Sequence, residues 1–141
     1  MATLCSVART NYFRVVDVEA FKVWIKSGGM GDQLEVVNGV EGDRVGKVCL
    51  LAEFGWPETI YDEENDDYVD FLPFLQPHIA EGEIVIVIES GNEKLRYCYG
   101  KSIAFTRHGV LASVSTGDIY ELVGALLHRE DNGAGIDQAT Y

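Results

Sequence analysis

The alternation of apolar and polar positions divides the chain into strands and helices joined by glycine-rich turns. The strongest strand signal is the run from Ile84 to Ile88, inside a strand predicted over 83–90. Five consecutive β-branched residues favour a strand covered on both faces, so this segment is predicted to be central in a sheet. Further strands are predicted over 11–16, 33–37, 44–53, 94–106 and 110–115.

Apolar residues at helical spacing predict three helices. The first begins after Asp17, a typical N-cap residue, and ends at the glycines of 28–29. The second begins at 65–66 and is shortened or broken by Pro73 and Pro77, since an interior proline ends or kinks a helix.

The third helix is predicted over 118–129, with an apolar stripe that is expected to pack on the sheet: Ile119, Leu122, Val123, Leu126 and Leu127. The order is therefore β-α-β-β-α-β-β-β-α. Adjacent hairpin strands predict an α+β fold, with a largely antiparallel sheet and helices packed on one face. One domain is expected over 1–130, followed by a flexible C-terminal tail over 131–141.

Charge is distributed unevenly along this pattern. The sequence has 23 acidic and 11 basic residues, a net charge of −12, and no Lys or Arg between Lys47 and Lys94. Because residues 48–93 hold twelve of the acids, the middle third carries the whole net charge. A negative field repels nucleic acid and anionic membranes, so basic proteins are the expected partners. An acidic face that only keeps the protein soluble is the competing interpretation.

The acids are densest over 58–70, where seven carboxylates occur with two tyrosines. DNA presents one charge per about 1.7 Å of its axis, and this segment offers a comparable density to a basic groove. Tyrosine adds contact area at low entropic cost. The residues predicted to bind a partner are Glu58, Tyr61, Asp62, Glu63, Glu64, Asp66, Asp67, Tyr68 and Asp70. An EF-hand is excluded, because the Gly and Glu that its loop requires are replaced by Asp67 and Pro73.

A secondary binding patch is predicted on the strand over 94–106. Lys94 and Arg96 share one face of that strand, and Tyr97 lies on the other. Arginine and tyrosine are over-represented at binding hot spots, which makes these three residues candidates. A half-exposed edge strand explains the same pattern equally well.

Cys5, Cys49 and Cys98 are odd in number, widely spaced and without a C-x-x-C pair. Neither an intramolecular disulfide nor a zinc site is expected from such spacing. No apolar run approaches the roughly 20 residues that span a bilayer, and the first residues do not resemble a signal peptide. The expected location is the cytosol, with no cofactor and no metal, and the oligomeric state stays open.

Catalytic motifs are absent from the sequence. The glycines of 28–31 follow a helix instead of opening one, so they do not predict a phosphate-binding loop. The histidines are far apart, and no nucleophile elbow or metalloprotease motif occurs. An enzyme is therefore not favoured. The alternative left open is an enzyme or small-ligand-binding protein with a pocket lined by Tyr97, Tyr99, Arg107 and His108.

Two stretches resemble sequences of small proteins carried by phages and plasmids: residues 11–21 (NYFRVVDVEAF) and 82–89 (GEIVIVIE). Such small acidic proteins are similar in character to anti-defence proteins of the antirestriction and anti-CRISPR types, several of which act as nucleic-acid mimics. The resemblance implies an inhibitor that acts in the cytosol of a host cell. It transfers no site residues.

Charge and resemblance together lead to one functional hypothesis. The chain is expected to be a non-enzymatic inhibitor that occupies a basic, nucleic-acid-binding surface of a host defence complex, without binding nucleic acid directly. An immunity protein that neutralises a basic nuclease toxin has the same electrostatics and stays open as an alternative.

Overall fold

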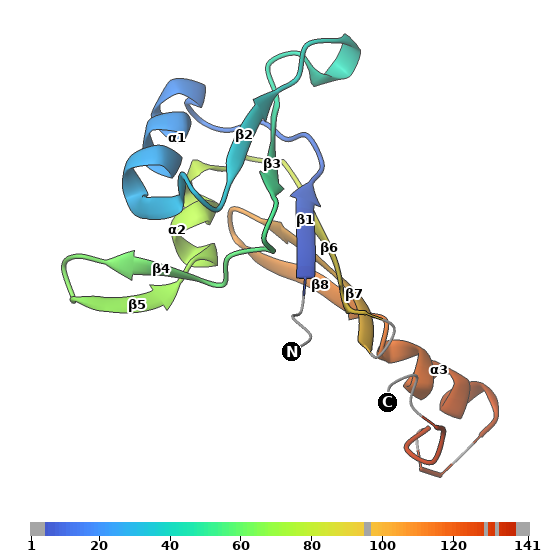
Figure 1. Cartoon of the computed structure of the whole chain (residues 1–141). Coiled ribbons are helices and arrows are strands. Elements are labelled where there is room, and N and C mark those ends of the chain that lie inside the picture. The colour runs from blue at the N-terminus through green and yellow to red at the C-terminus, as the bar shows by residue number, and fades with distance from the viewer. Residues whose placement is uncertain (1–4, 95–96, 129, 132, 138–141) are drawn as a thin grey trace.

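The computed structural model describes residues 5–94, 97–128, 130–131 and 133–137 (Figure 1). Six strands form one antiparallel sheet in the order β2-β3-β1-β6-β7-β8. Their bounds are β1 Cys5–Thr10, β2 Glu35–Asn38, β3 Val48–Ala52, β6 Val85–Glu93, β7 Tyr97–Thr106 and β8 Gly109–Ser115. The predicted α+β class with a largely antiparallel sheet is confirmed.

The remaining elements are one hairpin and three helices. The hairpin consists of β4 (Thr59–Asp62) and β5 (Asp67–Asp70). The helices are α1 (Val18–Ile25), which continues into a π-helical turn (Lys26–Met30), α2 (Leu72–Leu75) and α3 (Asp118–Leu126). Short 3-10 turns cover Gly42–Arg44 and Gln76–His78. The described residues follow the order β-α-β-β-β-β-α-β-β-β-α, which contains two strands more than predicted.

The predicted central position of the 83–90 segment is confirmed, because β6 lies between β1 and β7. Its predicted coverage on both faces is wrong. Val85 and Val87 are buried, whereas Ile86 and Ile88 are 38% and 58% exposed. Helices α1 and α2 both lie on one side of the sheet, which we call the inner face (Figure 1). The opposite side, the outer sheet face, has no helix over it within the described residues.

The core fills the space between the inner face and the two helices. Phe21 of α1, Leu75 of α2 and Phe105 of β7 are fully buried and belong to one hydrophobic cluster. Helix α1 begins as predicted, because a side-chain oxygen of Asp17 accepts a hydrogen bond from the Ala20 amide at 3.1 Å. The core therefore holds α1 and α2, which are distant in sequence, on the same face of the sheet (Figure 1).

Two predicted elements in the first half of the chain are corrected. Residues 11–16 are not a regular strand and form only isolated bridges through Phe13 and Val15, because β1 ends at Thr10. The helix predicted from 65–66 is instead strand β5. Its Val69 pairs with Ile60 of β4 and faces the core, a period-two arrangement that overrides the helical spacing.

The prediction that the last helix packs on the sheet is wrong. Helix α3 lies beyond the end of β8, away from α1 and α2 (Figure 1). Its Ile119, Leu122 and Leu126 are 52%, 55% and 70% exposed. Strands β7 and β8 run past the helical layer, so the helix that follows them starts too far from the core to cover it. Gly133, in the predicted tail, is buried beside α3.

Candidate functional site: an acidic hairpin and the groove beside it

The predicted partner-binding residues form one structural unit, residues 58–70, which we call the acidic hairpin. It projects from the body of the protein (Figure 1). Ile60 is 5% exposed and anchors the hairpin in the core. At the base, the Phe71 amide donates to the Glu58 carbonyl oxygen at 2.9 Å. The segment between these anchors is free to face a partner.

The turn of the acidic hairpin is ordered by its own side chains. One carboxylate oxygen of Asp62 accepts the Glu64 amide at 3.0 Å, and the other accepts the Asn65 side-chain amide at 2.6 Å. Asp66 follows with a φ of 48°, in the left-handed region that aspartate tolerates better than most residues. Asp62 and Asp67 then face each other directly across the two strands.

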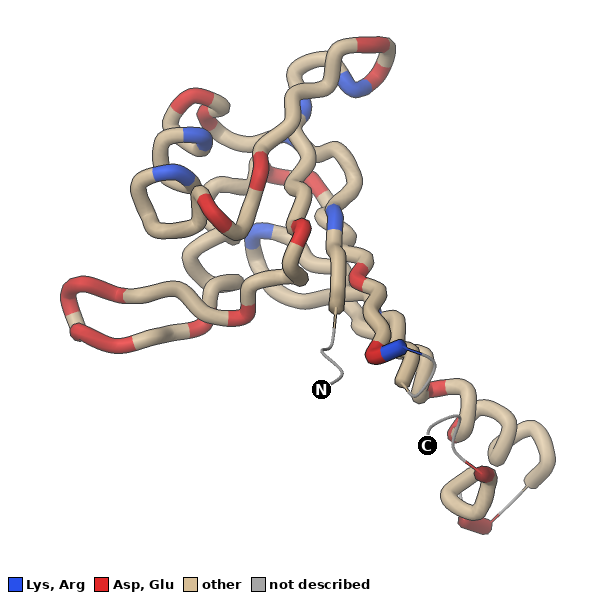
Figure 2. Tube along the Cα trace, viewed as in Figure 1, with Lys and Arg blue, Asp and Glu red and all other residues tan. Residues whose placement is uncertain are grey.

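The carboxylates of the acidic hairpin face solvent. Asp62 is half-buried, and the other six are exposed: Glu58, Glu63, Glu64, Asp66, Asp67 and Asp70. Figure 2 shows these acids around the loop, with no Lys or Arg among them. Of the seven, Glu58 is the one that forms an ion pair within the described residues, with Lys101 at 3.5 Å. The hairpin therefore presents almost uncompensated negative charge.

Two tyrosines lie side by side on the acidic hairpin. The rings of Tyr61 and Tyr68 meet edge to face at 5.4 Å and are 45% and 69% exposed. The Tyr61 hydroxyl donates a hydrogen bond to Asp66. This bond raises the pKa of Tyr61 above its usual value, and desolvation and the nearby acids add smaller contributions in the same direction. The hydroxyl thus stays protonated, and the exposed pair adds aromatic contact area to the charge.

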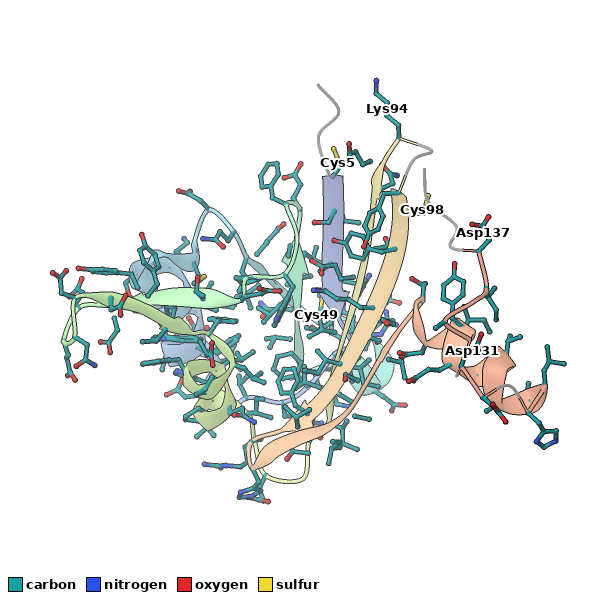
Figure 3. The ribbon with its side chains drawn as sticks, turned by 90° about the horizontal axis from the view of Figure 1, so that it is seen from below. Cys5, Cys49, Lys94, Cys98, Asp131 and Asp137 are labelled. Atoms are coloured by element: carbon teal, nitrogen blue, oxygen red, sulfur yellow. The ribbon has the colours of Figure 1, made fainter. Side chains whose placement is uncertain are left out.

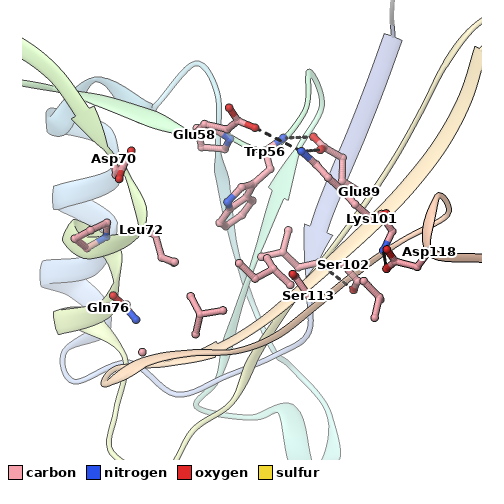
Figure 4. A pocket seen from close by; sticks show the side chains of 18 residues that line it. Trp56, Glu58, Asp70, Leu72, Gln76, Glu89, Lys101, Ser102, Ser113 and Asp118 are labelled. Atoms are coloured by element: carbon pink, nitrogen blue, oxygen red, sulfur yellow. Dashed lines mark hydrogen bonds and ion pairs between the residues drawn. The ribbon is translucent and has the colours of Figure 1, made fainter. Parts of the chain in front are cut away.

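A groove of about 690 Å³ opens beside the base of the acidic hairpin, between α2 and the inner face of β7 and β8 (Figure 4). Its apolar walls come from Trp56, Leu72, Val87, Ile103, Val110 and Val114. Glu58 and Asp70, which close the base of the hairpin, also line this groove. The hairpin and the groove therefore form one continuous surface.

An ion pair between a buried carboxylate and a half-exposed ammonium lies at one end of the groove. The side chain of Glu89 on β6 is 7% exposed and lies 3.1 Å from the Lys101 ammonium. Glu89 also accepts the Trp56 amide at 2.7 Å. The hydrogen bond to Glu89 raises the pKa of Lys101, which outweighs the opposing effect of burial. The pair fastens the loop that carries Trp56 to the sheet.

The charge in the groove is negative overall. Carboxylates of Glu58, Asp70, Glu89 and Asp118 face one ammonium, that of Lys101, among the lining residues. Asp118 is held by the Ser115 amide, which donates to it at 2.7 Å. Apolar walls with an acidic rim suit a side chain that has an apolar stem and a cationic end, as arginine and lysine do.

The secondary patch lies elsewhere. Lys94 stands at the far end of the β6–β7 hairpin, away from the acidic hairpin (Figure 3). Tyr97 is 43% exposed and contacts Tyr99, with ring centres 6.0 Å apart. Arg96 lies outside the described residues. The two predicted surfaces therefore do not form one site.

The residues of the alternative pocket do not converge. Tyr97 begins β7, whereas His108 lies in the turn after its end, a separation of about 30 Å at the rise of an extended strand. His108 instead contacts the Glu81 carboxylate at 2.8 Å, and both are exposed. Neither end of β7 forms a pocket from all four residues that were predicted to line it.

Sequence reasoning missed the groove and its ion pair. Glu89 stands two positions after Val87 and four after Val85, in phase with the buried side of β6. An acid in that phase signals a buried carboxylate that needs a cationic partner. The partner, Lys101, follows from the β6–β7 register, in which Glu89 pairs with Lys101. The position of Asp118 at the start of α3 did not indicate from the sequence that it would line the groove.

Cys49 is buried in β3, whereas Cys5 and Cys98 are exposed near one end of the sheet (Figure 3). No group of three or more His, Cys, Asp or Glu in the described part of the chain is arranged to hold a metal ion. Within the same residues, no helix has the length and apolar character to cross a membrane. Comparison with family models, curated proteins and solved structures gave no match.

Proposed function

We propose that this chain is a non-enzymatic binding protein that places its acidic hairpin in a basic, nucleic-acid-binding surface of a partner protein and blocks it. The observation that carries the proposal is the continuity of the hairpin with the groove through Glu58 and Asp70. A charged loop alone would explain solubility. A charged loop whose base opens into an apolar-walled, acidic groove also offers depth for a partner side chain.

The proposed binding has two parts. Exposed carboxylates of the acidic hairpin attract the basic surface over distances of about 8–10 Å at ordinary ionic strength and speed the encounter. Arginine or lysine side chains of the partner then enter the groove, where Trp56 offers an aromatic face and Glu58 and Asp118 offer carboxylates. The attraction provides orientation, and the groove provides the buried contacts that slow dissociation.

The partner that we propose is a nucleic-acid-binding component of a host defence complex, of the kind that antirestriction and anti-CRISPR proteins inhibit. Such components hold DNA or RNA in grooves rich in lysine and arginine. A projecting hairpin with seven carboxylates competes for that groove without itself binding nucleic acid. The sequence resemblance and the position of the charge support this choice.

The test begins with capture of the partner from host lysate and its identification. Affinity is then measured at two salt concentrations for the wild type and for a hairpin variant with five neutral substitutions: Asp62→Asn, Glu63→Gln, Glu64→Gln, Asp66→Asn and Asp67→Asn. We expect the hairpin variant to bind at least tenfold more weakly at low salt, mainly through slower association. The wild-type complex should weaken as salt rises.

A matched control removes five exposed carboxylates from other places: Glu19→Gln, Asp32→Asn, Glu35→Gln, Glu41→Gln and Glu130→Gln. It has the same net charge as the hairpin variant, so it separates position from total charge. The control should bind almost as tightly as the wild type. The proposal fails if the folded hairpin variant keeps wild-type affinity, or if the control loses as much affinity as the hairpin variant.

A further inference from the structure

A hollow of about 430 Å³ lies on the outer sheet face, between β1, β6 and the loop that joins β2 to β3. We call it the basic hollow, because three basic side chains line it: Arg9, Arg44 and Lys47. Its floor is apolar and comes from Ile86 and Ile88 of β6, which are 38% and 58% exposed. Tyr12 forms part of the wall. None of these residues belongs to the acidic hairpin or its groove.

The three cations are not neutralised by the protein. Within the described residues, the ion pairs involve Lys101, Arg107 and His108, and none involves a cation of the basic hollow. Arg9 donates to the Thr10 carbonyl oxygen at 3.3 Å, a neutral acceptor. Asp43 lines the rim of the hollow but forms no ion pair there. In a chain with 23 acids and 11 bases, three unpaired cations at one place are unexpected for a surface shaped only by solubility.

The loop that carries two of these cations is tightly built. The Arg44 guanidinium lies 4.6 Å above the centre of the Tyr12 ring. Gly39 donates its amide to the Lys47 carbonyl oxygen at 2.9 Å. A Cβ at Gly39 would lie 1.9 Å from the Arg44 carbonyl oxygen, so the close approach of the two sides of the loop requires glycine. The backbone therefore fixes the positions from which Arg44 and Lys47 reach the hollow.

We propose that the basic hollow binds a small anion in which a phosphate group is joined to a flat, apolar body. The guanidinium groups of Arg9 and Arg44 and the ammonium of Lys47 would hold the phosphate, since arginine matches phosphate oxygens with paired donors. Ile86 and Ile88 would contact the body. The volume of the hollow falls within the range of small-molecule sites, roughly 300–1,000 Å³. The site lies across the sheet from the acidic hairpin and is independent of the function proposed above.

The direct test is titration of the full-length chain, labelled at isoleucine methyl groups, with phenyl phosphate, AMP, inorganic phosphate and adenosine. Saturable shifts of the Ile86 and Ile88 methyl signals are expected with phenyl phosphate and AMP. Inorganic phosphate should bind at least tenfold more weakly, because it lacks the apolar body, and adenosine should cause no shift there. Tighter binding of AMP than of phenyl phosphate would extend the site to nucleotides.

Variants identify the groups that hold the phosphate. The pair Arg9→Gln and Lys47→Gln should lower the affinity for phenyl phosphate at least tenfold, since each charged hydrogen bond contributes strongly. The matched control, Lys22→Gln on α1 with Lys26→Gln in the turn that follows it, removes the same charge outside the hollow and should leave the affinity unchanged within twofold. Asp43→Asn should increase the affinity about two- to threefold, because it removes a carboxylate from the rim.

Three results would overturn the proposal. The first is the absence of saturable shifts at Ile86 and Ile88 with both phosphate esters. The second is an equal loss of affinity in the Arg9→Gln and Lys47→Gln double variant and in its Lys22 and Lys26 control, which would show only general electrostatic attraction. The third is a decrease in affinity for Asp43→Asn with the fold retained by circular dichroism. The Asp43 variant keeps the test decisive even if the double variant unfolds.

Discussion

Glu89 is a buried carboxylate that joins strand β6 to β7 and to the loop that carries Trp56. Its carboxylate lies on the inner face beside the buried Val87 of the same strand, and it is held by the Lys101 ammonium and the Trp56 amide. Removing one partner of such a pair leaves a charge without compensation in a poorly solvated place, whereas replacing both partners is far milder. The loss in free energy of unfolding should therefore be smaller when both partners are replaced than the sum of the losses from the two single replacements.

A double-mutant cycle tests the pair. Lys101→Met is expected to lower the free energy of unfolding by about 1–3 kcal/mol, less than for a fully buried pair because Lys101 is half exposed. In a Glu89→Gln background the same change should cost at least about 1 kcal/mol less. Urea unfolding of the four proteins gives the coupling. Additive costs would show that the pair contributes no stabilising interaction.

His78 predicts a pH dependence of stability. Its ring stacks on Trp24 at 4.3 Å, and burial there lowers its pKa below the usual value. Because the folded state disfavours the protonated ring, the stabilisation is present above the ordinary pKa of histidine and is lost as the pH falls toward the lower folded value. Thermal unfolding should therefore show a decrease in stability from pH 7.5 to 5.5.

The variant His78→Gln should reduce that decrease, because its side chain does not titrate. His128→Asn is the control, since His128 is exposed and asparagine tolerates its φ of 53°. If His78→Gln and wild type lose stability in parallel over this range, another group is responsible for the pH dependence.

At the scale of elements, the sequence predicted well wherever local signals agreed with long-range packing. Helix α1 has an N-cap, an apolar face and a glycine end, and it forms as predicted. Residues 65–72 carry apolar residues at helical spacing, yet the pairing of Ile60 with Val69 makes a hairpin. That pairing depends on contacts across the turn, which the spacing of one segment does not contain.

Helix α3 fails for a different reason. Its residues form a helix, but the helical spacing of apolar residues does not determine whether that helix lies close enough to the sheet to pack on it. The same limit applies to the groove: Trp56, Lys101 and Asp118 are widely spaced in sequence, and only the tertiary structure brings them together. The acidic segment over 58–70 could be located from the sequence because its residues are contiguous, but its form as a hairpin was not predicted.

The position of α3 leads to a contrast between leucines. Leu122→Gln and Leu126→Gln, on an exposed face, should each change the free energy of unfolding by less than about 0.5 kcal/mol. Leu75→Ala, in the core, should cost about 2–5 kcal/mol. Chemical unfolding of the three variants makes the comparison. A cost above about 2 kcal/mol for either α3 change would mean that this face is buried in solution.

At the scale of the whole molecule, the densest group of acids and the three cations of the basic hollow lie on different faces. The acidic hairpin projects from the body of the protein and carries acids but no Lys or Arg (Figure 2). The outer sheet face carries exposed isoleucines and the cations of the basic hollow. A net charge of −12 thus does not describe any single face of this protein. Each face should be tested with ligands of opposite character, basic proteins for one and phosphate esters for the other.

The direct pairing of Asp62 with Asp67 gives the acidic hairpin a further property. Like charges opposite each other across two strands repel, so the free hairpin is held closed against its own charge. Added salt should screen this repulsion and slow amide hydrogen exchange at Phe71, which closes the hairpin base. A bound basic surface would relieve the same repulsion, so ordering of the hairpin and binding are thermodynamically linked. Salt is therefore expected to act in opposite directions on the free hairpin, which it should stabilise, and on the proposed complex, which it should weaken.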